Sequence, residues 1–190
     1  MNFYISDLHF GHGNILKFDG RPWFNTQEME EDLIARWNAK VSKSDHVFIL
    51  GDFCWGLADM WRRILPKLNG FKHLIKGNHD LVKMPADIRK MFASVSDYKE
   101  VKDNGRLICM SHYPMLAYKH DSDPNTYMLY GHVHNTFEYR AMLAAIGAYK
   151  DLVFKETKGT FPYQGNLYNC WGGFFNWTPA TLDEIIARGR

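Results

Sequence analysis

Short apolar runs along the chain each end in a cluster of glycine, aspartate, asparagine and histidine. Runs of this length, rich in aromatic and branched residues, are typical of buried β-strands. The runs occupy residues 3–6, 47–50, 74–75, 107–110 and 127–130, and the polar clusters follow at 7–9, 51–52, 77–80, 111–112 and 131–134. The pattern therefore predicts strands that present polar side chains at their carboxyl ends.

Helical periodicity separates the early strands. Asn25 and Glu28 have the spacing of a capping box at a helix N-terminus. The apolar face that follows repeats every four residues, at Met29, Leu33, Trp37 and Val41. A second helix is indicated over residues 61–68, and Pro66 should shorten or kink it because proline interrupts the helical hydrogen bonds.

The second half of the chain contains more turn signals. Asn104-Gly105 lies between two β-type runs and predicts a type I′ hairpin turn. A last helix is expected to begin at Thr181, with Glu184 as the partner in a capping box.

Residues 135–161 have the least regular pattern. Residues 141–149 look helical, 155–160 look like a loop, and the whole stretch could be an insertion of unknown role. Strands alternating with helices favour an α/β layered fold with its site at the carboxyl edge of the strands. A length of 190 residues is typical of one domain, so residues 1–190 are expected to form a single unit.

Composition narrows the function classes. Apolar residues make up 46% and charged residues 23%, which excludes a disordered or fibrous chain. A net charge of +2 is too balanced to predict binding to a nucleic-acid backbone or an anionic membrane. No apolar run is long enough to span a bilayer and no signal peptide is visible, so a cytoplasmic location is expected. The three cysteines are expected to be buried free thiols.

The polar residues at the strand ends have the chemistry of metal ligands. They supply carboxylate oxygens, imidazole nitrogens and one amide oxygen, a donor set that suits divalent ions of intermediate hardness. A single catalytic ion needs three or four protein ligands, and this set is about twice as large, which implies two ions. The set comprises Asp7, His9, Asp52, Asn78, His79, His112, His132 and His134.

These motifs resemble the blocks of the calcineurin-like metallophosphoesterase superfamily, in order and in spacing. The opening residues 5–14 further resemble small single-domain members from bacteria and phages. The resemblance implies a fold of two packed mixed β-sheets flanked by helices, a four-layer αββα sandwich. The blocks are Asp7-Leu8-His9, Gly51-Asp52, Gly77-Asn78-His79-Asp80, His112 and Gly131-His132-Val133-His134.

The resemblance also implies a division of the ligands between two ions. One ion would be held by Asp7, His9 and His134. The other would be held by Asn78, His112 and His132. Asp52 would bridge them. Mn²⁺ is the expected metal, with Fe²⁺, Zn²⁺, Ni²⁺ and Co²⁺ as alternatives.

Catalytic roles follow for two residues of the third block. His79 is the expected general acid, because a phosphoester alkoxide leaves poorly until it is protonated. Asp80 is expected to orient the His79 ring by accepting a hydrogen bond, although a turn or capping role is the plainer alternative.

Three further residues are candidates for substrate contacts. His12 and Asn14 could touch the phosphate, or could simply form loop hydrogen bonds. Arg21 could clamp an anion, against the alternative of a solvated surface arginine. Trp55 and Tyr113 are placed to line a pocket.

The expected activity is hydrolysis of small, nucleotide-like phosphodiesters by a bridging metal hydroxide. Gly51-Asp52 continues as Phe53-Cys54-Trp55, unlike the Asp-Arg-Gly of the protein phosphatase branch, which argues against a protein substrate. The alternatives are a phosphomonoesterase, a nuclease acting on nucleic-acid ends, or a catalytically weak interaction scaffold. No membrane partner is expected, and the oligomeric state is open.

Overall fold

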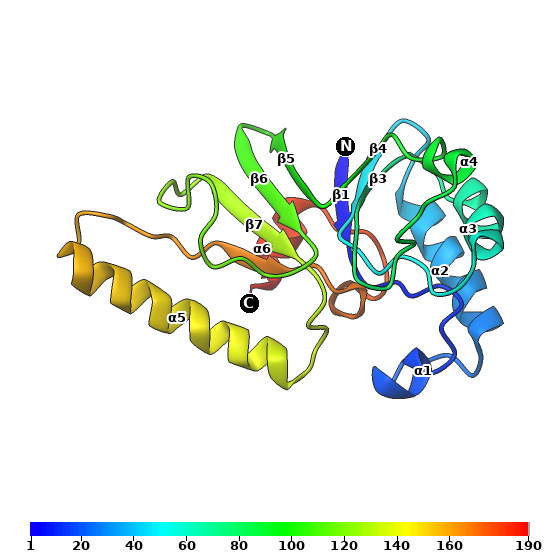
Figure 1. The fold of residues 1–190 in the computed structure, drawn as a ribbon, viewed down its shortest axis with the longest axis horizontal. Coiled ribbons are helices and arrows are strands. Elements are labelled where there is room, and N and C mark those ends of the chain that lie inside the picture. The colour runs from blue at the N-terminus through cyan, green and yellow to red at the C-terminus, as the bar shows by residue number, and fades with distance from the viewer. Residues whose placement is uncertain (190) are drawn as a thin grey trace.

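The computed structural model describes residues 1–189 and contains two four-stranded sheets (Figure 1). The strands of the first sheet are all parallel, whereas in the second sheet β5 and β6 form an antiparallel hairpin and the other pairs are parallel. The expected pair of mixed sheets therefore holds for the second sheet only. In order, the first sheet has β1 (Asn2–Ile5), β2 (His46–Ile49), β3 (Phe71–Ile75) and β4 (Ser94–Ser96), and the second has β5 (Tyr98–Asp103), β6 (Arg106–Ser111), β7 (Thr126–Tyr130) and β8 (Leu167–Asn169).

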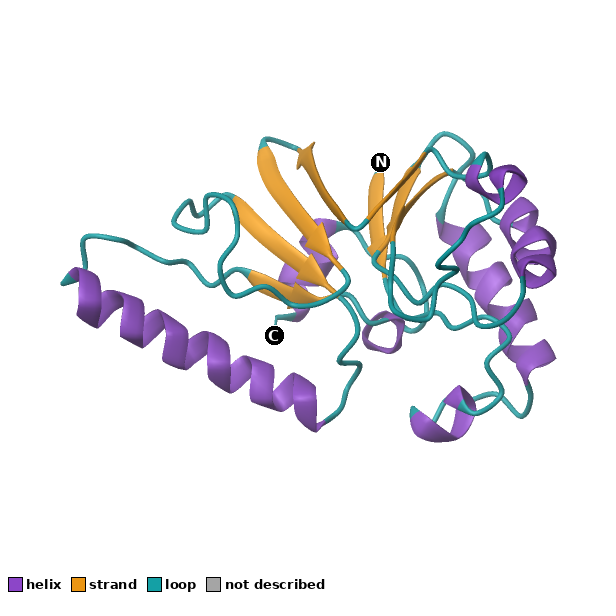
Figure 2. Cartoon of the chain, in the orientation of Figure 1, coloured by secondary structure: helices purple, strands orange, loops and turns teal. Residues whose placement is uncertain are grey.

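Helices flank both sheets (Figure 2). Three of them, α2, α3 and α4, cover the outer side of the first sheet, and α5 lies along the outer side of the second. The helices are α1 (Ile15–Phe18), α2 (Thr26–Lys40), α3 (Ala58–Ile64), α4 (Ala86–Arg89), α5 (Phe137–Thr157) and α6 (Leu182–Arg188), with short 3₁₀ turns at Leu65–Lys67 and Gly172–Phe175.

Successive side chains of a strand point to opposite faces of its sheet, so each sheet packs against helices on one face and against the other sheet on the other face. In β2, Val47 and Ile49 face the helices of the first sheet, while Phe48, together with Leu50 just after the strand, packs between the sheets. In the second sheet, Leu129 points between the sheets and its neighbours on β7 face the α5 side. The result is the expected order of helix, sheet, sheet and helix.

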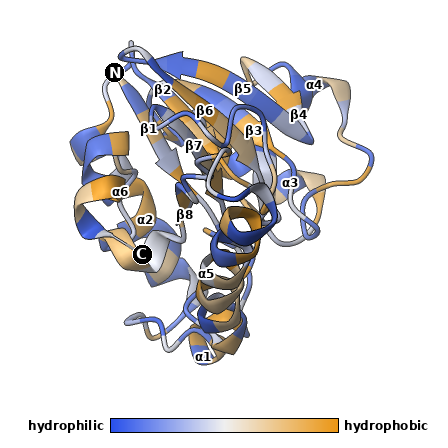
Figure 3. Ribbon diagram, turned by 90° about the vertical axis from the view of Figure 1, so that its left-hand side faces the viewer, coloured by the Kyte–Doolittle hydropathy of each residue, from blue (hydrophilic) through white to orange (hydrophobic). Residues whose placement is uncertain are grey.

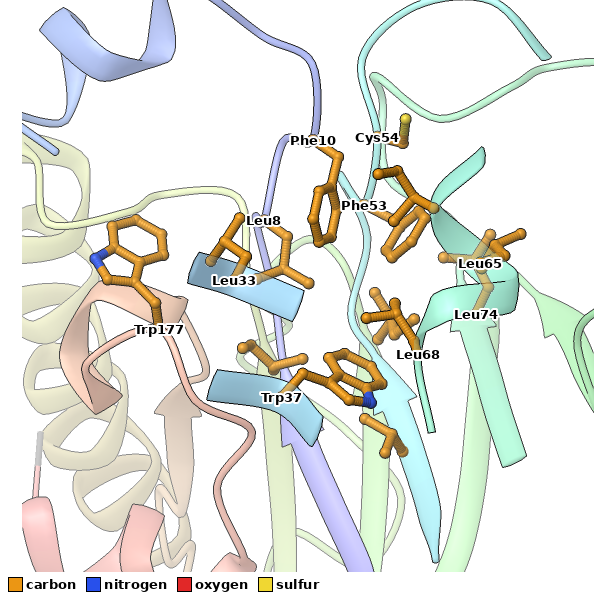
Figure 4. Close-up of a cluster of buried hydrophobic side chains, with 14 of the residues drawn as sticks. Leu8, Phe10, Leu33, Trp37, Phe53, Cys54, Leu65, Leu68, Leu74 and Trp177 are labelled. Atoms are coloured by element: carbon orange, nitrogen blue, oxygen red, sulfur yellow. The ribbon is translucent and has the colours of Figure 1, made fainter. Parts of the chain in front are cut away.

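The largest apolar cluster lies between the first sheet and its helices (Figure 4). Trp37 of α2 and Phe53 after β2 are almost fully buried there. Figure 3 shows apolar and polar residues side by side on α2 and α6, as expected for helices with one packed face.

The predicted capping box is confirmed for α6, and for α2 it is confirmed in part. Thr181 and Glu184 form the expected reciprocal capping box. Asn25 accepts a hydrogen bond from the Glu28 backbone N–H, but the Glu28 carboxylate accepts from Phe24 rather than from Asn25. The second helix is shortened as predicted, since α3 ends at Ile64 and a 3₁₀ turn containing Pro66 follows.

Residues 135–161 are more regular than the sequence indicated. The predicted helix at 141–149 is confirmed, but α5 extends to Thr157, so the loop expected at 155–160 is wrong for its first half. Lys158 ends the helix in a left-handed conformation. Within residues 1–189, no helix combines the length and the apolar character needed to cross a membrane.

The carboxyl ends of the parallel strands of both sheets lie on one side of the molecule, whereas β5 runs in the opposite direction. The segment after β8 joins the sheets there, because the Ser6 N–H donates to the Cys170 carbonyl and the Cys170 N–H donates to Tyr130. Asn104 and Gly105 form the hairpin turn with positive φ angles, as predicted. All three cysteines are buried and free.

Candidate metal centre

Residues at the ends of three strands adopt backbone conformations that aim their side chains at one place. Left-handed φ angles occur at Asp7 (57°), His9 (52°), Asp52 (51°), His132 (71°) and His134 (44°). Residues other than glycine rarely adopt this conformation, which costs of order 1–3 kcal/mol each. Such strain concentrated after β1, β2 and β7 marks this edge as the functional part of the fold.

Two glycines of the motifs allow the strand ends to approach each other. A Cβ atom at Gly131 would lie 2.7 Å from Oδ2 of Asp7. A Cβ atom at Gly77 would collide with the carboxylate of Asp52. Any other residue at these two positions would therefore push the candidate ligands apart.

Three side chains form the first group: Asp7, His9 and His134. Their ligand atoms lie within 4.8 Å of one another. His134 Nε2 lies 3.3 Å from His9 Nε2 and 3.4 Å from Asp7 Oδ1. The Asp7 carboxylate is fully buried and accepts the backbone N–H of His132. The group brings β1 of the first sheet together with the loop after β7 of the second.

A second group consists of Asp52, His112 and His132, again with ligand atoms within 4.8 Å. Asn78 extends it, because its Oδ1 lies 2.9 Å from His112 Nε2. Asp52 Oδ2 lies 3.5 Å from His112 Nε2 and 3.6 Å from His9 Nε2 of the first group. One carboxylate oxygen therefore lies between the two groups.

Electrostatics at the site favour bound positive charge. Burial lowers the pKa of His9 to about 3, which keeps its ring in the neutral form that binds metals. Burial also opposes charge on His112, but the nearby carboxylates of Asp52 and Asp7 overcome it and raise its pKa to about 9. Asp19 and Asp7 raise the pKa of His134 to about 10 against the same effect. Buried carboxylates require such partners, and divalent cations are equally suited to that role.

Asp19 contacts His134 of the first group on the side away from Asp7, and it was not predicted from the sequence. Its Oδ1 lies 2.6 Å from His134 Nδ1, so the carboxylate fixes the ring with Nε2 pointing at Asp7. Carboxylates commonly orient metal-binding histidines in this way. Asp19 stands in an Asp-Gly-Arg stretch that indicates only a turn, so no pattern in the sequence distinguished it.

Arg21 is neither an anion clamp nor a solvated arginine. Its side chain is fully buried. The guanidinium donates to the backbone carbonyls of Asp7 and Leu8, to the Asp19 carboxylate and to the Met29 sulfur. Because these contacts occupy its donors, Arg21 braces Asp19 and the first block instead of facing a substrate.

Asp80 also differs from its expected role. Its buried carboxylate accepts the backbone N–H groups of Gly77, Asp52 and Phe53. It therefore ties the loop after β3 to the loop after β2, and does not orient the His79 ring. Of the two roles considered from the sequence, the turn-stabilising one fits.

His79 lines a cavity of about 480 Å³ together with His9 and His134 of the first group and Asp52 and His132 of the second. Its side chain is 38% exposed, and Nε2 lies 4.0 Å from Asp52 Oδ2. The indole of Trp55 lies against it, with ring centroids 4.6 Å apart. His12 stacks on the same indole at 4.1 Å. Asn14 lines the cavity too, so of the three substrate candidates His12 and Asn14 reach it and Arg21 does not.

Comparisons with known proteins match most of the chain. The calcineurin-like phosphoesterase superfamily domain matches residues 2–154. The uncharacterized protein MJ1445 of Methanocaldococcus jannaschii is 34% identical over 132 residues, which are 68% of this chain and 67% of that protein. The Gene 66 protein of Mycobacterium phage D29 is 27% identical over 158 residues, or 70% of this chain and 77% of that protein.

A solved structure shares the fold. The crystal structure of the protein of unknown function AQ665 from Aquifex aeolicus superposes with a TM-score of 0.66 at 23% identity, covering 98% of both chains. The chain belongs to the calcineurin-like phosphoesterase superfamily. Its two groups of histidine and aspartate side chains could each hold a metal ion.

Proposed function

We propose that the protein is a dinuclear metal-dependent phosphoesterase that hydrolyses small phosphodiesters. The observation that carries the proposal is the position of Asp52, whose Oδ2 lies 3.6 Å from His9 Nε2 and 3.5 Å from His112 Nε2. A carboxylate oxygen between two groups of ligands is what a pair of ions about 3.5–4 Å apart requires.

The donor set fits two ions. Asp7, His9 and His134 would hold the first ion. The second would be held by Asn78, His112 and His132, with Asp52 shared. Oxygen and imidazole donors without cysteine suit Mn²⁺, our first choice, although Fe²⁺, Zn²⁺, Ni²⁺ and Co²⁺ tolerate the same ligands. The ions would supply hydroxide from water at neutral pH and neutralise charge on the phosphoryl oxygens.

The residues of the chain itself contribute positioning and a proton. His79 is the proposed general acid, because it lines the cavity without being part of either group and its imidazole can give a proton to the departing oxygen. Packing against Trp55 would limit the rotation of the His79 ring. His12 and Asn14, which line the same cavity, are proposed to contact the substrate.

The size and charge of the site support a small substrate. A cavity of about 480 Å³ is within the usual range for small-molecule sites. Its lining residues are His9, His12, Asn14, Ile15, Phe18, Asp19, Asp52, Trp55, His79, His132, His134 and Thr136, with no lysine or arginine to follow a nucleic-acid strand.

The test is a panel of esters with protein loaded with Mn²⁺. We expect about two ions per chain by elemental analysis, hydrolysis of bis(4-nitrophenyl) phosphate, and loss of that activity in a strong chelator. Preferential hydrolysis of 4-nitrophenyl phosphate would indicate a monoesterase, and cleavage of single-stranded DNA a nuclease. Full activity in chelator would overturn the metal mechanism, and inactivity on every ester with two ions bound would favour the scaffold alternative.

A further inference from the structure

An apolar groove begins beside the second group and continues along α5. It has a volume of about 470 Å³ and is lined by Tyr113, Pro114, His132, Val133, Phe137, Glu138, Ala141, Met142 and Ala145. His132 also lines the cavity that contains His79, so this histidine separates two adjoining hollows. A molecule with its phosphorus at the metal centre would extend into both.

The walls of the groove are held in place by hydrogen bonds. The Ser111 hydroxyl donates to the backbone carbonyl of Tyr113 and fixes one wall. On the other wall, Thr136 caps α5 and donates to the Val133 carbonyl over 2.8 Å. The Tyr113 ring packs against His132, with centroids 4.5 Å apart. The groove is thus a feature of the fold rather than a gap beside a loose helix.

The chemistry of the lining differs from that of the His79 cavity. Apart from the His132 imidazole, Glu138 is the one ionisable group with a formal charge among its lining residues, and that charge is negative. Tyr113 and Phe137 expose 51% and 71% of their surface at its edges. Exposed apolar side chains gathered at one place commonly mark a binding site. Because the groove offers no cation, it disfavours a second phosphate or a carboxylate.

We infer that this groove holds the retained organic group of a phosphodiester, and that this group is uncharged and apolar. The inference rests on the proposed function. The leaving group would lie in the cavity that contains His79, because the proposed general acid must reach the departing oxygen. The retained group then lies on the other side of His132, in the groove. A monoester has no retained organic group and would leave the groove without an occupant.

The experiment keeps the leaving group constant and varies the retained group. Methyl, propyl and butyl 4-nitrophenyl phosphates would be hydrolysed by the protein loaded with Mn²⁺. We expect kcat/KM to rise about tenfold from methyl to butyl, since each fully buried methylene contributes up to about fourfold and the groove is open to solvent. A 3-carboxypropyl ester, which is similar in length to the butyl ester, should be a poorer substrate because it is anionic.

Two matched variants test whether the groove is responsible. Ala141→Trp should fill the groove and reduce the methyl-to-butyl ratio of kcat/KM to less than twofold, and this ratio is read within the variant, whatever its absolute rate. Ala144→Trp carries the same helix-propensity cost at an exposed position of α5 outside the groove lining, and should keep the tenfold difference. An unchanged circular dichroism spectrum and thermal midpoint, with two bound ions per chain, show that each variant is folded.

The outcomes separate this inference from the proposed function. Equal kcat/KM for all alkyl esters in the unmodified protein, or the same chain-length dependence in both tryptophan variants, would overturn the inference and leave the phosphoesterase intact. No hydrolysis of any ester by protein with two bound ions would overturn the proposed function itself.

Discussion

The two groups of candidate ligands have different surroundings. The first group is braced from behind by protein, since His134 contacts Asp19 and Asp19 is in turn held by the buried Arg21. Arg21 itself lies over the Trp177 ring at 4.1 Å. Both groups border the cavity that contains His79, but the second group also borders two further hollows, and His132 lines one of them, the apolar groove.

A second hollow adjoins the same group. Asn78 and His112 line a cavity of about 320 Å³. We infer from these different surroundings that the two groups have different roles. The first group would bind its ion firmly through a rigid surround, and the second would hold an ion at the point where substrate binds. Substitutions in and around the two groups would test whether their roles differ in this way.

Asp52→Asn should weaken the binding of both ions, because the Asp52 carboxylate lies between the two groups. A neutral amide is a far weaker ligand for a divalent cation. We expect both metal content and turnover to fall, the latter by more than the 10–100-fold typical of residues that only support ligands. Elemental analysis and the bis(4-nitrophenyl) phosphate assay on the same samples provide the measurement. Two retained ions with near-normal turnover would mean that Asp52 is not the bridge.

His79→Ala should impair chemistry while both groups keep their ions. Loss of a general acid costs on the order of 10²–10⁴ in turnover. The loss should be large for an alkyl leaving group and small for 4-nitrophenol, which departs without a proton. His46→Ala, a substitution of an exposed histidine at the opposite end of β2, is the control.

The leaving-group series also identifies the role of His79 if it is not the acid. An equal loss for every leaving group with both ions retained would assign His79 to phosphate positioning. Loss of one ion would make it a ligand.

Asp19→Asn should weaken the first group alone. The variant loses the carboxylate that orients His134, and such support is typically worth 10–100-fold in metal affinity. Titration of metal-free protein with Mn²⁺ should show one binding event weakened to this extent and the other unchanged. Asp151→Asn on the exposed side of α5 is the control. Equal weakening of both events would show that the two groups do not differ as we describe.

The same comparison explains what the sequence could reveal. Ligands directly after strands were predicted, because a short apolar run followed by Gly, Asp and His is a local pattern and parallel strands end at one edge. The Asn104-Gly105 hairpin was predicted for the same reason, since the turn type depends on two adjacent residues.

Asp19 was missed because its partner His134 is 115 positions away in the sequence. Asp80 was predicted as a site residue but expected to orient His79, because the backbone N–H of Asp52 that it accepts is 28 positions away. The length of α5 was missed for another reason. Leu152 and Phe154 are exposed near its end, so the apolar positions there do not follow the helical period that indicates a packed face.

The smallest expected effect concerns Trp55, which packs on His79 with ring centroids 4.6 Å apart. Aromatic pairs contribute about 0.5–1.5 kcal/mol, so Trp55→Ala should reduce turnover by roughly two- to tenfold. If Trp55 acts by positioning the general acid, the reduction should appear with an alkyl leaving group and almost vanish with 4-nitrophenol, while metal content stays constant. Trp55→Phe keeps a ring at this position and should restore most of the rate. A loss that is the same for both leaving groups would assign Trp55 to substrate binding, through its place in the wall of the cavity rather than through His79.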